Sequence, residues 1–339
     1  MVSRWEQTLR QAGCPDADFD ARELYRFVTG RDPRFDDGPT PAEAARLDEL
    51  TARRAAREPL QYILGEWEFM GIPLNVGPGV LCPRPDSEVV CETAIELLAG
   101  VPAPTVLDLC AGTGCLGLGL RRFVPEAQVT CVEKSPSALT YLRRNVQGRG
   151  VQAVEADAFG YYRQLPANSL DLLISNPPYL TAAEMAALMP ETAREPAMAL
   201  DGGRDGLTFY RLITEKYRDA VRPGGWLVLE IGCAQAAQVL ALGQANGWQN
   251  GQCRKDYGGN DRVVFFQKLG IGSALAGAPD AQTVKKGQSS RETLPSFVGA
   301  GQPVRVPCSP ARKRLPYNDV SCLAAYRGAS RTPPPTNEN

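Results

Sequence analysis

The chain has 339 residues, of which 43% are hydrophobic, and a formal net charge of -1, so it can bury at least one sizeable core. It contains no histidine, which excludes Ser-His and Cys-His nucleophile pairs and removes the commonest general base and metal ligand. No run of about 18 apolar residues occurs, and the first residues lack the apolar stretch of a signal peptide. We therefore expect a cytoplasmic protein with no membrane partner.

The charge distribution and the cysteine content indicate which ligands and macromolecules the chain can bind. Residues 271–339 carry nine Lys/Arg and four Asp/Glu, so this tail has a charge of +5 and the rest of the chain -6. An acidic body is a poor partner for a phosphate backbone, and we expect no nucleic-acid substrate. The ten cysteines form no Cys-x-x-Cys pair, and we interpret them as reduced core residues without a metal site.

Residues 1–75 have the pattern of a small helical domain. Thr40–Glu43 combines an N-cap hydroxyl, a first-turn proline and a glutamate three residues after the cap, which predicts a helix over 41–57. Apolar residues at helical spacing predict another helix over 18–29. Between 60 and 85, the spacing of Gly, Pro and aromatic residues predicts a short hairpin and a loop instead of a helix.

Strand and helix patterns then alternate over 76–269. Helices are predicted over 87–98, from the glycine loop to 123, over 136–146 and over 207–221, and strands over 105–109, 128–133, 151–155, 170–175 and 226–231. Residues 248–266 have the pattern of two strands around a Tyr-Gly-Gly-Asn turn. This alternation predicts an α/β fold, a doubly wound parallel sheet with an antiparallel edge hairpin. Residues 270–339 lack apolar periodicity and are predicted to be disordered.

A glycine-rich loop follows the strand predicted over 105–109. Glycines there let the backbone approach a ligand at the carboxyl edge of the sheet, which predicts a nucleoside pocket. The loop also fits the dinucleotide pattern G-x-G-x-x-G between Gly112 and Gly117, so a nicotinamide dehydrogenase is an alternative. After the next two strands, Glu133 is placed to bind ribose hydroxyls and Asp157 the adenine amino group. The candidate cofactor residues are Asp108, Cys110, Ala111, Gly112, Thr113, Gly114, Glu133, Asp157, Ala158 and Asn176.

Asn176, Pro177, Pro178 and Tyr179 follow the strand predicted over 170–175. Two consecutive prolines remove backbone donors and fix φ, so nearby carbonyl oxygens stay available as acceptors. The Asn176 side-chain oxygen and the Pro177 carbonyl can each accept one N–H of a planar NH2 group, which exposes the nitrogen lone pair to an activated methyl group. Tyr179 can cover the flat face of the substrate. Asn176, Pro177 and Tyr179 are therefore the candidate catalytic residues, and Pro178 is a further substrate-binding residue.

Several blocks together closely resemble the peptide chain release factor glutamine methyltransferases. They are Glu58–Gly65, Pro83–Glu88, the Asp108 glycine loop, Asn176–Tyr179 and Asp201–Leu207, in one order over residues 10–268. The resemblance implies a helical N-terminal domain on a Rossmann-like class I methyltransferase domain. It also implies S-adenosylmethionine as cofactor, with S-adenosylhomocysteine as product, a cofactor site at Cys110–Gly114 and Glu133, and a substrate site that includes Arg84. Two departures stand out: Cys110 where glycine is frequent, and Ala158 where a larger aromatic residue is frequent.

The resemblance implies that the side-chain amide of the Gly-Gly-Gln glutamine in class-1 release factors is methylated. We expect in-line displacement by the amide nitrogen of a release factor bound to a monomeric enzyme, with the extra proton shed to water and alignment supplying most of the rate enhancement. Alternatives are a glutamine methyltransferase for a ribosomal protein and an adenine amino methyltransferase acting on DNA or RNA, which would have to flip its base and hold phosphates. A binding module without catalysis is a further alternative.

Overall fold

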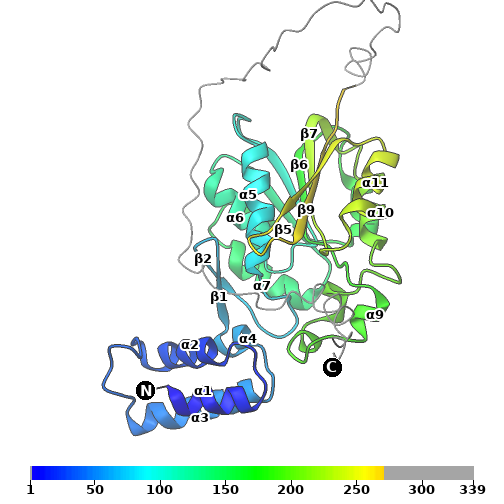
Figure 1. Ribbon diagram of the computed structural model, residues 1–339. Coiled ribbons are helices and arrows are strands. Elements are labelled where there is room, and N and C mark those ends of the chain that lie inside the picture. The colour runs from blue at the N-terminus through cyan, green and yellow to red at the C-terminus, as the bar shows by residue number, and fades with distance from the viewer. Residues whose placement is uncertain (1, 271–339) are drawn as a thin grey trace, which may run out of the picture.

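The computed structural model describes residues 2–270, which form a helical segment beneath an α/β body (Figure 1). The predicted disorder of 270–339 lies outside the described residues apart from Gly270. Within residues 2–270, the helices are too short or too polar to cross a membrane.

Four helices build the N-terminal segment. They are α1 (Ser3–Gln11), α2 (Ala17–Thr29), α3 (Pro41–Ala55) and α4 (Leu60–Leu64). The predicted capping box is present at α3, where the Thr40 side chain accepts from the Glu43 N–H and the Glu43 side chain accepts from the Thr40 N–H. The helices enclose a core of their own that includes Leu9, Leu24 and Leu47.

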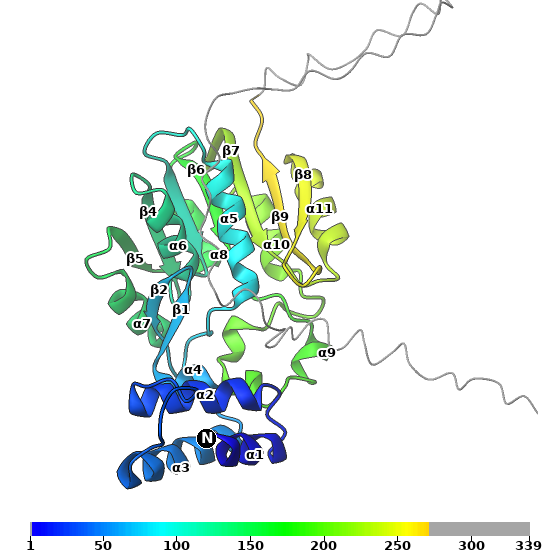
Figure 2. The ribbon, with the colours of Figure 1, turned by 60° about the vertical axis from the view of Figure 1, so that its left-hand side comes forward.

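The prediction for the segment after residue 60 was wrong in one respect, because α4 occupies its start. Three of its five residues are apolar or aromatic and buried, so tertiary burial holds a turn of helix that has no recognisable helical period of its own. The hairpin that follows is confirmed as β1 (Glu66–Phe69) and β2 (Ile72–Asn75). Its two-residue turn has positive φ at Met70 (49°) and Gly71 (73°), as the tightest hairpins require. Figure 2 shows the hairpin standing between the helical segment and the body.

A seven-stranded sheet forms the centre of the body, in the order β5-β4-β3-β6-β7-β9-β8. Its strands are β3 (Thr105–Leu109), β4 (Gln128–Glu133), β5 (Val151–Glu155), β6 (Leu170–Ser175), β7 (Val221–Glu230), β8 (Gln249–Lys255) and β9 (Asp261–Gln267). The first five in spatial order are parallel, whereas β9 runs antiparallel to both β7 and β8. The doubly wound sheet with an antiparallel edge hairpin is thus confirmed.

Helices cover both faces of the sheet. One hydrophobic core lies under α5 (Glu88–Leu97), α6 (Cys115–Phe123) and α7 (Pro136–Val146), and the short 3-10 turn η1 (Pro85–Ser87) leads into α5. The other core lies under α8 (Ala158–Tyr161), α10 (Thr208–Lys216) and α11 (Ala236–Ala245). The turns η2 (Tyr162–Gln164), η3 (Thr192–Arg194) and η4 (Ala197–Ala199) and the short helix α9 (Ala182–Met185) fill the connections.

The structure differs from the predictions at three points in the second half of the sheet: the end of the helix before β7, the start of β7 at Val221 instead of 226, and a helix that was not predicted. The helix predicted over 207–221 ends at Lys216, because Val221 already pairs with Leu170 at the start of β7. The register shifts before Trp226 pairs with Leu172, since the intervening Arg-Pro-Gly-Gly segment interrupts the ladder. Helix α11 was not predicted: its Ala-rich and Gly-containing sequence has apolar residues around most of its circumference and therefore no clear 3.6-residue stripe.

Candidate active site

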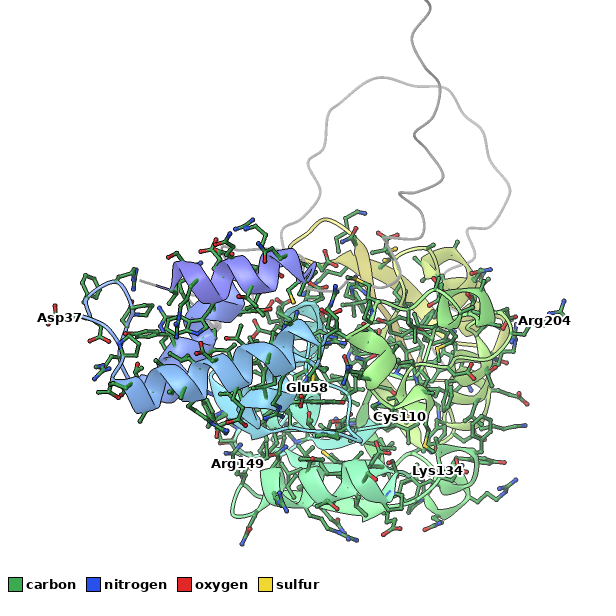
Figure 3. The ribbon with its side chains drawn as sticks, turned by 90° about the horizontal axis from the view of Figure 1, so that it is seen from below. Asp37, Glu58, Cys110, Lys134, Arg149 and Arg204 are labelled. Carbon is green, nitrogen blue, oxygen red and sulfur yellow. The ribbon has the colours of Figure 1, made fainter. Side chains whose placement is uncertain are left out.

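A cavity opens at the carboxyl ends of β3, β4 and β6, the edge that Figure 3 views from below with Cys110 and Lys134 labelled. Most of the predicted site residues line it: Arg84, Asp108, Cys110, Ala111, Gly112, Thr113, Glu133, Asp157, Ala158, Asn176 and Pro178. Pro177 is buried outside this lining, and Tyr179 lines a second hollow next to it. The fold therefore gathers residues from five segments of the chain at one edge of the sheet.

The loop after β3 turns sharply through three left-handed residues, Cys110 (φ 60°), Gly112 (φ 55°) and Gly114 (φ 81°). A Cβ on Gly112 would meet only Val80 Cγ2 at 3.9 Å, so the backbone there is open to close approach by a ligand. Positive φ is strained for a residue with a Cβ, which explains why glycine suits the place that Cys110 occupies. Gly114 does not line the cavity. It caps α6, and a Cβ there would lie 2.6 Å from Leu142 Cδ1.

Asp108 lies at the floor of the cavity and is almost fully buried. Its Oδ2 accepts the Gly117 N–H at 2.9 Å, whereas its Oδ1 has no hydrogen-bond partner in the part of the chain that the structure describes. Burial raises the pKa of this carboxyl to about 7, and the Gly117 hydrogen bond only partly offsets that rise. A buried acceptor without a partner is costly, so Asp108 Oδ1 is available to a donor on a ligand.

Glu133 ends β4 as predicted, and its carboxylate already accepts three backbone N–H groups. The donors are Gly112 to Oε2 at 2.9 Å, Lys134 to Oε1 at 2.8 Å and Ser135 to Oε1 at 2.7 Å. An ionised carboxylate has about four acceptor positions, so one remains on Oε2. Glu133 thus holds the glycine loop in place and still offers an acceptor at the cavity wall.

Asp157 and two aromatic rings form the far wall of the cavity. Asp157 caps α8 by accepting the Phe159 N–H at 3.0 Å and pairs with Lys134 Nζ at 2.7 Å, and these contacts lower its pKa, with Lys134 as the largest cause. Phe159 packs edge-on against Phe209 with ring centroids 5.3 Å apart, and both rings line the cavity. Phe209 comes from α10, and no motif in the sequence marked it. The two rings supply flat apolar surface that the small Ala158 side chain does not.

Asn176 follows β6 and reaches both hollows. Its side chain is half-buried, and both prolines after it are buried. Among residues 2–270, neither the Asn176 carboxamide nor the Pro177 carbonyl has a hydrogen-bond partner. Two acceptors without partners in this part of the chain therefore stand at adjacent residues, and their contact with a planar NH2 group stays a prediction.

A second hollow, adjoining the cavity at Asn176, is lined by Leu81, Arg84, Asp86, Asn176, Tyr179, Leu180, Ala199, Leu200, Glu230 and Arg262. Arg84 also reaches it and pairs with Glu195, a residue 111 positions later in the chain. Glu195 accepts the Cys82 N–H at 3.0 Å as well. Through Glu195, the 181–200 connection that carries Pro196 and Met198 is fixed against the cavity. The sequence offered no signal for these contacts.

The Asp201–Leu207 block packs against the backbone of Tyr179 and Leu180. Gly202 donates its N–H to Leu180 O at 2.9 Å, and a Cβ on Gly202 would lie 2.6 Å from Tyr179 Cα. The Gln235 side chain donates to Tyr179 O at 2.9 Å. Glycine is therefore required at 202 for close approach, and Gln235 is a further positioning residue that sequence reasoning missed.

Known proteins are similar to this chain over most of the residues that the structure describes. The model of the PrmC N-terminal domain matches residues 1–65, and that of the methyltransferase small domain matches residues 91–203. A release factor glutamine methyltransferase of Geobacter sulfurreducens is 40% identical over 262 residues, covering 76% of this chain and 91% of that protein. Proteins of the same name from Moorella thermoacetica and Streptomyces coelicolor are 39% and 36% identical, covering 68% and 79% of this chain and 83% and 96% of their own lengths.

Proposed function

This chain belongs to the family of release factor glutamine methyltransferases, and on that premise we propose that it methylates the side-chain amide nitrogen of the glutamine in the Gly-Gly-Gln motif of class-1 release factors. Its methyl donor is S-adenosylmethionine, which supplies a methyl group already activated as a sulfonium. The single observation that carries the proposal is that two acceptors without partners among residues 2–270 stand at adjacent positions, the side chain of Asn176, which lines the cavity, and the carbonyl of Pro177 directly after it.

The residues around the cavity fit such a donor. Glu133 has an acceptor position left for a ribose hydroxyl, and Asp108 Oδ1 is a buried acceptor without a partner within residues 2–270. Phe159 and Phe209 offer flat surfaces for an adenine ring. Acidic groups on the floor and wall also favour a cationic ligand over an anionic one.

Asn176 and Pro177 would hold the target amide. Each accepts one N–H, so the NH2 plane is fixed and the nitrogen lone pair points out of it. Both hydrogen bonds strengthen as the nitrogen becomes positive, which stabilises the transition state more than the ground state. An amide is a weak nucleophile, and alignment of this kind can supply on the order of 7 to 11 kcal/mol in well-oriented systems. Tyr179, held by Gly202 and Gln235, would form the adjacent wall.

The remaining residues have supporting roles in the proposal. We assign 1–75 to substrate recognition and 76–269 to catalysis, because the helices of the first segment have a core of their own. We also propose that the enzyme acts as a monomer in the cytoplasm. An adenine amino group would suit the same two acceptors, but the relatives are named for a protein substrate.

The experiment is a transfer assay with mapped product. The enzyme is incubated with methyl-labelled S-adenosylmethionine and a full-length class-1 release factor, and the label is located by mass spectrometry of peptides. The proposal expects label on the Gly-Gly-Gln glutamine and none on a Gln→Glu variant of the factor. Label at other residues, or on an oligonucleotide supplied in its place, would disprove it.

A further inference from the structure

Glu230 is a buried carboxyl beside Asn176 that has no role in the proposed function. It ends β7, the strand next to β6, and the register pairs Ser175 with Leu229. The next residues along the two parallel strands are Asn176 and Glu230, which brings them to the same level of adjacent strands about 4.8 Å apart. Both line the second hollow, together with Tyr179.

The other charged groups that face this hollow are already engaged with opposite charges. Arg84 pairs with Glu195, and Arg262 pairs with Asp256 at 3.1 Å and lies 3.8 Å from Asp86. Glu230 is only 2% exposed, and the one hydrogen bond that its side chain accepts within residues 2–270 comes from a neutral donor: Ser87 Oγ donates to Oε2 at 2.6 Å. Within the described residues, therefore, Glu230 makes no ion pair, and Oε1 accepts no hydrogen bond.

Burial without a paired cation changes the acidity of this group. It raises the pKa of Glu230 to about 7, and Arg262 and the Ser87 hydroxyl offset only part of the rise. Asp86 raises the pKa slightly, and Arg84 lowers it slightly. Tyr210 also packs here, but its hydroxyl donates to the main-chain oxygen of Glu230 and leaves the carboxyl alone. A carboxylate of this basicity is suited to taking up a proton near neutral pH.

We propose that Glu230 accepts the proton that the target amide loses on methylation. The inference rests on the proposed function. The amide nitrogen forms its bond to the methyl carbon as the carbon–sulfur bond breaks, and the sulfur keeps the bonding pair. The N–H bond on the Asn176 side then breaks, its electrons remain on nitrogen, and the proton passes through one water to Glu230 Oε1. The carboxylic acid that results returns the proton to solvent. This replaces direct loss of the proton to bulk water.

A purely architectural role is the competing explanation, because Ser87 stands at the start of α5 and Glu230 anchors it. The two explanations differ in pH dependence. If Glu230 must be ionised for activity, kcat/KM falls as the pH drops below about 7, because Glu230 becomes protonated. We call this fall the acid limb of the profile. The Ser87 hydroxyl lowers the pKa of Glu230. Removing this hydroxyl should therefore raise that pKa and move the acid limb to higher pH. If Glu230 only anchors α5, replacing Ser87 should not shift the pH dependence of kcat/KM.

The test is the pH profile of kcat/KM from pH 5.5 to 9, with a full-length release factor and S-adenosylmethionine, for wild type, Glu230→Gln, Ser87→Ala and Glu155→Gln. Glu230→Gln keeps the size of the side chain and an acceptor for Ser87. We expect it to lose on the order of 10²-fold or more at pH 8 and to lose the acid limb. Ser87→Ala should shift the limb upward. Glu155→Gln, the same change at the exposed end of β5, should match wild type.

Asp108 needs its own control, because its pKa is also raised to about 7. Asp108→Asn is expected to weaken calorimetric binding of S-adenosylmethionine while the acid limb stays. An acid limb that persists in Glu230→Gln, whatever its rate, or a wild-type profile without one, would overturn the proposal. The identity of the substrate is judged separately, since mapping the label to glutamine with wild-type enzyme does not depend on Glu230.

Discussion

Arg57 donates two hydrogen bonds to the Glu191 carboxylate, from Nε to Oε1 at 2.7 Å and from Nη2 to Oε2 at 2.6 Å, although the two residues are 134 positions apart in sequence. Arg54 reaches the same carboxylate at 2.9 Å and also pairs with Asp20 at 2.7 Å. Arg54, Asp20 and Glu191 are at most 1% exposed. The helical segment is therefore locked to the 181–200 connection, which itself forms part of the cavity wall.

Removing the shared carboxylate should destabilise the protein strongly. In Glu191→Ala, the buried Arg54 loses one of its carboxylate partners and Arg57 loses its bidentate pair, and breaking a buried network costs about 3 to 5 kcal/mol. Urea unfolding would measure the loss. Glu49→Ala, which breaks the exposed pair with Arg46, should change the free energy of unfolding by about 0.5 kcal/mol or less. Equal losses in the two variants would contradict the assigned network.

Stability should fall as the pH rises from 5.5 to 8. Burial raises the folded-state pKa of Asp108 and of Glu230 to about 7, well above the values of the unfolded chain. The folded state thus binds more protons in this window, and the stabilisation present at low pH is lost as the pH passes through the folded pKa. Urea midpoints at pH 5.5 and 8 would test this, and the fall should shrink in Asp108→Asn. A urea midpoint that rises with pH would contradict the raised pKa values of Asp108 and Glu230.

Glu133→Ala should weaken cofactor binding and also loosen the glycine loop. The change removes the acceptor offered to the ligand and leaves the Gly112, Lys134 and Ser135 N–H groups without their carboxylate. We expect a loss of about 1 to 3 kcal/mol in binding, or roughly 5- to 150-fold in Kd. Calorimetry with S-adenosylmethionine provides the measurement, with Glu155→Ala at the end of the neighbouring strand as control. Wild-type affinity in Glu133→Ala would remove Glu133 from the site.

Gly202→Ala should separate turnover from cofactor binding. The added Cβ would lie 2.6 Å from Tyr179 Cα and 2.9 Å from Gly206 Cα, so the backbone beside Pro178 must shift. A misplacement of this size can lower turnover by about 10²-fold. Cofactor affinity should change much less, because Tyr179 lies outside the cavity lining. Gly270→Ala is the matched control, since its Cβ would meet only Pro223 Cβ at 3.7 Å. Normal turnover in Gly202→Ala would refute the supporting role.

The sheet and the cofactor edge could be predicted closely from the sequence. The strands predicted over 105–109, 128–133, 151–155 and 170–175 match β3, β4, β5 and β6 residue for residue. Each is a short segment rich in apolar residues between loop residues, and four such segments alternating with helices leave few other arrangements. The motif residues then meet at one edge because parallel strands all end there.

What could not be predicted depends on contacts distant in sequence. Helix α4 forms because its side chains are buried by neighbouring helices, not because of its own period. Glu195 reaches Arg84 across 111 residues, and Gln235 reaches Tyr179 across 56. Phe209 lies on the cavity only because α10 packs against that face of the sheet. None of these residues belongs to a short motif, so only the folded chain reveals them.

Asn176 provides the most direct test of the central claim, that two free acceptors align the target amide. The measurement pairs calorimetric affinity for S-adenosylmethionine with the rate of methyl transfer onto an intact release factor, for wild type and Asn176→Ala. We expect the transfer rate to fall by about 10²-fold or more, because one of the two acceptors is lost, and the cofactor affinity to change much less. A normal rate in Asn176→Ala, or equal labelling of a factor without the glutamine, would contradict it.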